Sequence, residues 1–113
     1  MSKTKNSGSH HWIAQRLSAI VLLPLLIWLI YQVNNALLNF ENIGLLITNP
    51  INITLFMMVV IIAFYHSVLG LQVIFEDYVQ CKCLKVALNV ITYFITVFTI
   101  IITLFAVITV HLL

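Results

Sequence analysis

The residues best suited to chemistry lie in the stretch 63–78, where a histidine sits inside an apolar segment. Aliphatic and aromatic residues surround His66, and the segment ends in the acidic-aromatic pair Asp77-Tyr78. An ionisable side chain far from water in lipid is costly, so such residues usually have a function. Imidazole is also a common ligand of haem iron. The pattern predicts a redox site within a membrane; a neutral structural histidine, hydrogen-bonded to a neighbouring helix, is the alternative.

The spacing within this stretch places His66 and the Asp77-Tyr78 pair at different depths in the membrane. With the rise per residue of an α-helix, His66 would lie roughly 16 Å from Asp77 and roughly 20 Å from Asn52. This places His66 near the middle of a hydrocarbon core about 30 Å thick. Gly70, one turn further on, leaves room for a flat macrocycle or a neighbouring helix. Tyr78 at the interface could donate a hydrogen bond to a quinone carbonyl, with Asp77 beside it. An ordinary interfacial aromatic next to a solvated acid is the alternative.

Further candidates lie at the two ends of the chain. Arg16 borders the first apolar segment and offers a planar fork of donors that suits a carboxylate such as a haem propionate. A cation in this position can also serve only to set the topology. His10 and His11 lie at the same edge, whereas His111 lies near the opposite end of the chain. We predict no role for His111, because interfacial histidines are mostly incidental.

Composition identifies the class of protein. The chain has 113 residues, of which 63% are hydrophobic and 7% charged, and its mean hydropathy is +1.15. Soluble domains carry about 25% charged residues, so a membrane protein is expected. A net charge of +2 is too small to indicate nucleic-acid binding. Cys81 and Cys83 match neither a zinc motif nor a haem-attachment motif, so any haem would be held non-covalently.

The charges divide the chain into three apolar stretches. Each is long enough for a spanning helix of about 20 residues, and turn-forming residues such as Asn49-Pro50 shorten the middle one. We therefore predict an all-α membrane protein that forms a single anchor domain over 1–113. Its expected parts are a polar N-terminal tail at 1–11 and transmembrane helices at about 14–38, 53–76 and 86–111.

The placement of lysine and arginine predicts the orientation. Lys3, Lys5 and Arg16 precede or open the first span, and Lys82 and Lys85 lie between the second and third spans. The loop between the first and second spans contains neither residue type. By the positive-inside rule, the N-terminus and the second loop face inward, and the C-terminus faces outward.

The third span carries a stripe of small and hydroxylated residues that share one helical face: Asn89, Thr92, Thr96, Thr99, Thr103 and Ala106. Such residues let helices approach closely in lipid, so the stripe predicts helix packing. A proton or ion path is the alternative, but the stripe has no ionisable member. Three short helices could hardly enclose a large cofactor alone, and a partner membrane subunit is therefore expected.

At this point the motifs match a family. The chain resembles the small hydrophobic anchor subunits of succinate dehydrogenase, the D-type or small cytochrome b subunits of alphaproteobacterial or mitochondrial type. The segment His11-Trp-Ile-Ala-Gln-Arg-Leu-Ser-Ala19 is similar to their H-x-x-x-Q-R-x-[S/T]-A motif at the start of the first helix. His66-x-x-x-Gly70 followed by Asp77-Tyr78 is similar to their step from haem histidine to quinone tyrosine. The resemblance covers nearly the full length.

The resemblance implies roles for individual residues. His66 would be one axial ligand of haem b, and the second ligand would come from the partner anchor. Arg16 and His11 would lie near the haem propionates and the quinone pocket, although His10 could take the place of His11. Tyr78 would donate a hydrogen bond to a carbonyl oxygen of ubiquinone, and Asp77 would support it.

The resemblance also implies partners and a location. The chain would be a multi-pass anchor in a bacterial inner membrane, or in the mitochondrial inner membrane. It would pack with a second three-helix anchor of cytochrome b556 type, and with an iron–sulfur subunit and a flavoprotein subunit. It would not be an enzyme alone, but part of a succinate:ubiquinone oxidoreductase. The alternatives are the anchor of a fumarate reductase or another b-type cytochrome complex, and a small helical membrane protein without a cofactor.

Overall fold

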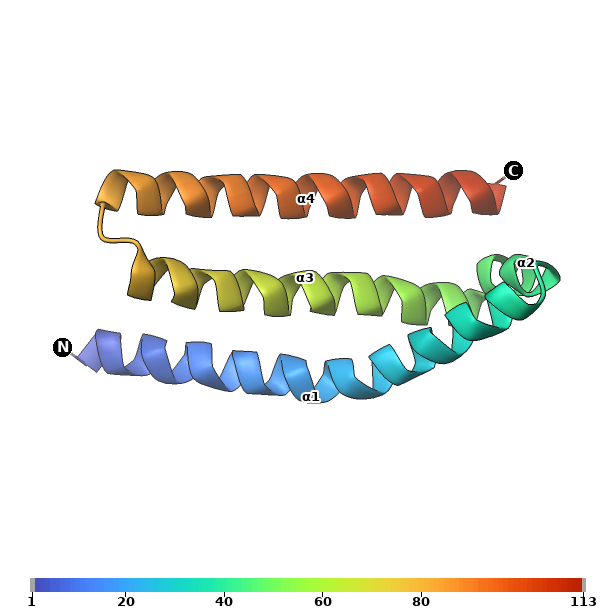
Figure 1. Ribbon diagram of the computed structural model, residues 1–113, viewed down its shortest axis with the longest axis horizontal. Helices are drawn as coiled ribbons and strands as arrows, with labels where there is room; N and C mark the ends of the chain where they lie inside the picture. The colour runs from blue at the N-terminus through green and yellow to red at the C-terminus, as the bar shows by residue number, and fades with distance from the viewer. Residues whose placement is uncertain (1, 113) are drawn as a thin grey trace.

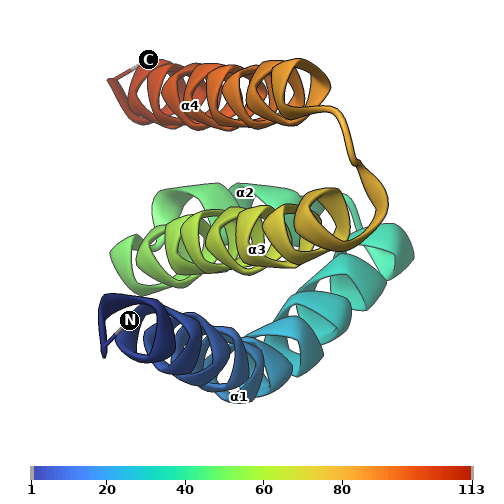
Figure 2. The ribbon, with the colours of Figure 1, turned by 90° about the vertical axis from the view of Figure 1, so that its left-hand side faces the viewer.

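The protein is a layer of three long helices with one short helix at its end. The computed structural model describes residues 2–112, and side chains from His10 to Leu112. The helices are α1 (Ser2–Leu38), α2 (Glu41–Thr48), α3 (Pro50–Tyr78) and α4 (Lys82–Leu112). Helix α3 lies between α1 and α4, as Figures 1 and 2 both show. The N-terminus and the α3–α4 connection share one end of the layer, and α2 and the C-terminus share the other (Figure 1).

The prediction of three membrane spans is confirmed. The three long helices contain segments long and apolar enough to cross a membrane, over His10–Leu38, Pro50–Tyr78 and Lys82–Leu112. The helices nevertheless extend beyond the predicted bounds. Helix α1 includes the segment predicted as a polar tail, and α4 begins at Lys82 rather than near 86. Hydropathy marks the lipid-embedded part of a helix, whereas the backbone hydrogen bonds continue past it.

The segment predicted as a turn between the first two spans contains α2. Asparagines in this segment cap or brace helices. The side chain of Asn39 accepts a hydrogen bond from Glu41 N at 3.0 Å, and Asn42 Nδ2 donates to Asn35 O at 3.0 Å. Asn49 accepts from Ile51 N at 3.0 Å and so caps α3. Because Asn is a favoured N-cap and Pro a favoured first residue, α3 begins at Pro50.

Helix α1 changes direction along its length. Pro24 lies inside it, and Figure 1 shows that α1 bends partway along its length. Proline has no N–H to donate to the carbonyl one turn earlier, and its ring crowds that carbonyl. The bend carries the second half of α1 toward α2.

Helix α4 packs against α3 through the predicted stripe. Its members are half-buried from Asn89 to Thr103, whereas Ala106 is exposed and Val107 takes the last position on this face. Thr92 and Thr103 donate to backbone carbonyls of their own helix at 2.8 Å, so their hydroxyls are satisfied in an apolar setting. The stripe is therefore a packing surface, as predicted.

Few side chains are buried within this one chain. The buried apolar residues are Leu25, Val59, Val68 and Leu69. Most other apolar side chains are exposed, and no residue of α4 is buried. A layer one helix thick leaves both of its faces open to lipid or to a partner. Among the described residues, the buried polar residue is Ser18, with 7% of its surface exposed. Ser18 belongs to the candidate site.

Candidate functional site

The centre of the candidate site is a contact between Ser18 of α1 and His66 of α3. Ser18 Oγ lies 2.9 Å from His66 Nδ1 and donates to the carbonyl of Gln15 at 2.9 Å. A hydroxyl has one hydrogen and two lone pairs. When that hydrogen goes to Gln15 O, the lone pair of Oγ accepts the Nδ1–H of His66. In the neutral tautomer that this order selects, the remaining nitrogen, Nε2, carries the lone pair that can bind a metal.

A second histidine joins the same two helices further along. His11 Nε2 lies 3.1 Å from the carbonyl oxygen of Leu69. Because a carbonyl can only accept, the ring nitrogen of His11 is the donor. This contact occupies His11 Nε2 and, with the Ser18–His66 contact, fixes the register of α1 against α3.

Gly70 lies where the two helices approach closely. A β-carbon built on this residue would lie 3.5 Å from Gln15 Nε2, which is an ordinary contact distance. The space beside Gly70 is therefore taken by a side chain of α1. Of the two readings offered by the sequence, room for a macrocycle or room for a helix, the structure supports the helix. The other end of the Gln15 amide, Oε1, is buried and has no hydrogen-bond partner among the described residues.

Arg16 lies on the outside of the α1–α3 pair. It is exposed, and its guanidinium carbon lies 5.2 Å from the centroid of the Trp12 ring, a cation–π arrangement. The contacts of His11 and Ser18 with α3 lie on either side of it along α1. Arg16 is therefore level with the His66–Leu69 turn of α3 and not with the end of that helix.

Asp77 and Tyr78 end α3, well away from His66. They are exposed, Tyr78 with 81% of its surface. At the rise of a helix they lie roughly 16–18 Å along α3 from His66. The structure thus brings His11, Gln15, Ser18 and His66 together at one level, with Arg16 on the outside, and leaves the Asp77-Tyr78 pair separate.

An open hollow of about 340 Å³ adjoins Ser18 between α1 and α3. Ala14, Leu17 and Val21 line it from α1, and Ile62 and Tyr65 from α3. Ser18 lines it as well, so this residue lies between the hollow and the His66 ring. The hollow leaves free volume around the Ser18 side chain.

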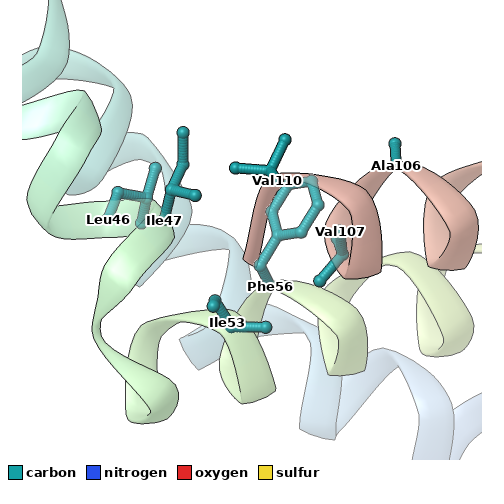
Figure 3. Close-up of a pocket in the computed structure, with 7 residues that line it drawn as sticks. All are labelled: Leu46, Ile47, Ile53, Phe56, Ala106, Val107 and Val110. Atoms are coloured by element: carbon teal, nitrogen blue, oxygen red, sulfur yellow. The ribbon is translucent and has the colours of Figure 1, made fainter. Parts of the chain in front are cut away.

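A cavity of about 180 Å³ lies at the other end of the layer, between α2, α3 and α4 (Figure 3). Its walls are aliphatic and aromatic, and include Ile47, Ile53, Phe56 and Val110. No lining residue carries a polar side chain, so the cavity cannot hydrogen-bond a quinone head group. It also lies at the end of α3 opposite Asp77 and Tyr78.

Sequence reasoning assigned no role to Gln15 or Ser18, although both fall in the motif that opens the first span. A signal was present. His11, Gln15 and Ser18 follow one another at spacings of four and three residues, which places them on one helical face. Arg16 falls off that face, in agreement with its exposure.

Comparison with known proteins identifies the family. The model of the succinate dehydrogenase/fumarate reductase transmembrane subunit family matches residues 2–110. A succinate dehydrogenase hydrophobic membrane anchor subunit of Rickettsia felis is 41% identical over 87% of this chain and 82% of its own length. Its counterpart in Rickettsia typhi is 38% identical over 88% and 81%. No solved structure matches. The chain therefore belongs to the succinate dehydrogenase/fumarate reductase transmembrane subunit family, as its motifs predicted.

Proposed function

We propose that this chain anchors a succinate dehydrogenase in the membrane and, with a second anchor subunit, holds haem b and forms part of a ubiquinone site. Its three spans and the relatives named above, all of them succinate dehydrogenase anchors, support the anchoring role. The family also includes fumarate reductase subunits. The names of the relatives favour succinate oxidation over fumarate reduction.

The observation that carries the haem proposal is the occupied Nδ1 of His66. A metal-binding histidine almost always donates its other ring N–H to an acceptor that fixes the ring. Ser18 Oγ is such an acceptor, so the residues fit an axial ligand. When bound, haem would supply one-electron chemistry in the membrane. His11, the other histidine at this level, donates Nε2–H to Leu69 O. The resemblance to the family assigns the second axial ligand to the partner anchor.

The propionates of the haem would meet Arg16. Its guanidinium is exposed and level with His66, and it offers the planar donor fork that suits carboxylates. Stacking on Trp12 restricts the side chain while leaving the edge of the fork open. His11 lies on the same helix with its Nε2–H donated to Leu69 O, and the neighbouring His10 is exposed.

The quinone end would be the tip of α3. The phenol of Tyr78 would donate a hydrogen bond to a ubiquinone carbonyl, and the carboxylate of Asp77 would orient it. Exposure of Tyr78 at the end of an apolar span supports this role. Lys82 and Lys85 lie in the first turns of α4 at the same end, so by the positive-inside rule this end faces the cytoplasm. Partner subunits would complete the pocket.

Replacement of His66 tests the proposal. In the purified whole complex, His66→Ala should remove the dithionite-reduced b-type bands or weaken haem retention, because an axial ligand is lost. Succinate oxidation with an artificial acceptor should continue, since this chain is the membrane anchor of the complex. His111→Ala, an exposed histidine in the last turn of α4, is the matched control. An assembled His66→Ala complex with wild-type haem content and spectrum would exclude axial ligation by His66.

A further inference from the structure

We propose that Ser18 is a positioning residue that sets the tautomer and the ring orientation of His66. The inference rests on the proposed function, since it concerns how His66 is presented to haem iron. The resemblance to known anchors gave Ser18 no such role. A chain of hydrogen bonds runs from His66 through Ser18 to the backbone of α1.

The first step is the direction of that chain. The last acceptor in the chain of hydrogen bonds is the carbonyl of Gln15 in α1, and Ser18 Oγ donates to it at 2.9 Å. Ser18 Oγ then accepts from His66 Nδ1 at 2.9 Å. Ser18 Oγ both donates and accepts, whereas Gln15 O only accepts and His66 Nδ1 only donates. This order leaves Nε2 of His66 as the lone-pair nitrogen.

The second step is the rigidity of the pair. Ser18 is buried, with 7% of its surface exposed. Its hydroxyl is fixed by the hydrogen bond to the Gln15 carbonyl of the same helix. The contact of His11 with Leu69 lies further along the two helices, and Gln15 packs beside Gly70. Together these contacts prevent α1 from sliding along α3. The Ser18 oxygen therefore stays at a fixed place relative to the imidazole.

The third step is the effect on a bound metal. An acceptor at Nδ1–H raises the basicity of the opposite nitrogen, and loss of such an acceptor typically lowers metal affinity 10–100-fold. The more basic ligand favours ferric over ferrous iron. Removal of the Ser18 hydroxyl should therefore weaken haem retention and move the haem midpoint potential to more positive values. Each tenfold change in the ferric-to-ferrous preference corresponds to about 59 mV for one electron.

The test is a potentiometric titration of haem b in the purified whole complex, together with the haem-to-flavin ratio. Ser18→Ala should show reduced haem content and a more positive midpoint potential. Ser18→Thr retains the hydroxyl and should restore both, because the hollow beside Ser18 has room for a methyl group. Ser67→Ala is the matched control, since Ser67 is exposed and adjoins His66 in the sequence. If Ser18→Ala does not assemble, Ser18→Cys, which keeps the size but is a poor acceptor, takes its place and should show the same shift.

The outcomes separate this inference from the proposed function. A wild-type midpoint potential and haem content in the variant without a hydroxyl would overturn the role of Ser18 while leaving axial ligation by His66 intact. A change that Ser18→Thr does not reverse would also overturn it, because the hydroxyl would not be its cause. Failure of the proposed function has a different signature, namely an unchanged haem in His66→Ala.

Discussion

Replacement of Gly70 by alanine tests whether the α1–α3 contact, rather than a cofactor, occupies the space beside this residue. A β-carbon at Gly70 would lie 3.5 Å from Gln15 Nε2, an ordinary contact that requires no displacement of either helix. Alanine is favoured over glycine inside a helix by about 0.5–1 kcal/mol. We therefore expect Gly70→Ala to retain haem b and to be neutral or slightly stabilising.

A larger side chain at the same position should behave differently. Gly70→Leu would extend past the β-carbon into the volume of Gln15, and overpacking of this kind costs about 1–3 kcal/mol. It would also push α1 from α3 and separate Ser18 from His66. We expect a lower thermal midpoint of unfolding and a loss of haem in Gly70→Leu but not in Gly70→Ala.

The assay is thermal unfolding of the purified complex with parallel haem spectra. Gly44→Ala is the control, because Gly44 lies in α2 and a β-carbon there would meet nothing within 4 Å. It reports the effect of helix propensity without any contact. The reasoning is refuted if Gly70→Ala assembles normally and loses its haem, since the open side of Gly70 would then face the cofactor and not Gln15.

Two further changes test the ends of α3. Tyr78→Phe removes only the phenolic hydroxyl, so quinone reduction should fall while succinate oxidation with an artificial acceptor and the haem spectrum stay unchanged; equal loss of both activities would indicate a role in assembly. Asn49→Ala removes the side-chain acceptor of Ile51 N and should lower stability by about 1 kcal/mol, measured by thermal unfolding, whereas Asn49→Asp or Asn49→Ser should retain most of it. An unchanged midpoint in Asn49→Ala would mean that lipid or a partner fixes the start of α3 without the cap.

The number of spans could be predicted because the charges are few and widely spaced. The exact ends of the helices could not, since helices α1 and α4 continue through polar residues that hydropathy assigns to water. The N-cap of α3 was readable from Asn49-Pro50, but these residues fit a turn equally well. Only the backbone shows that α2 fills the intervening segment.

The candidate site could be predicted from the sequence only in part. His66 could be found because an ionisable residue in an apolar segment is conspicuous on its own. Gln15 and Ser18 share one face of α1 with His11, but only the register of α1 against α3 brings that face to His66. Register between antiparallel spans is set by contacts between residues far apart in the chain, such as His11 with Leu69, and no pattern within a single span specifies it.

The same register narrows the role of Arg16. From the sequence, this residue could serve the haem propionates, the quinone pocket, or both. Its level matches the His66–Leu69 turn, whereas Tyr78 lies roughly 14–18 Å further along α3 by helical rise. Arg16 therefore lies nearer to His66 than to Tyr78 along the axis of α3. We therefore expect Arg16 to serve the propionates of a haem bound to His66, and we expect the donors around the quinone, other than Tyr78, to come from the partner subunits.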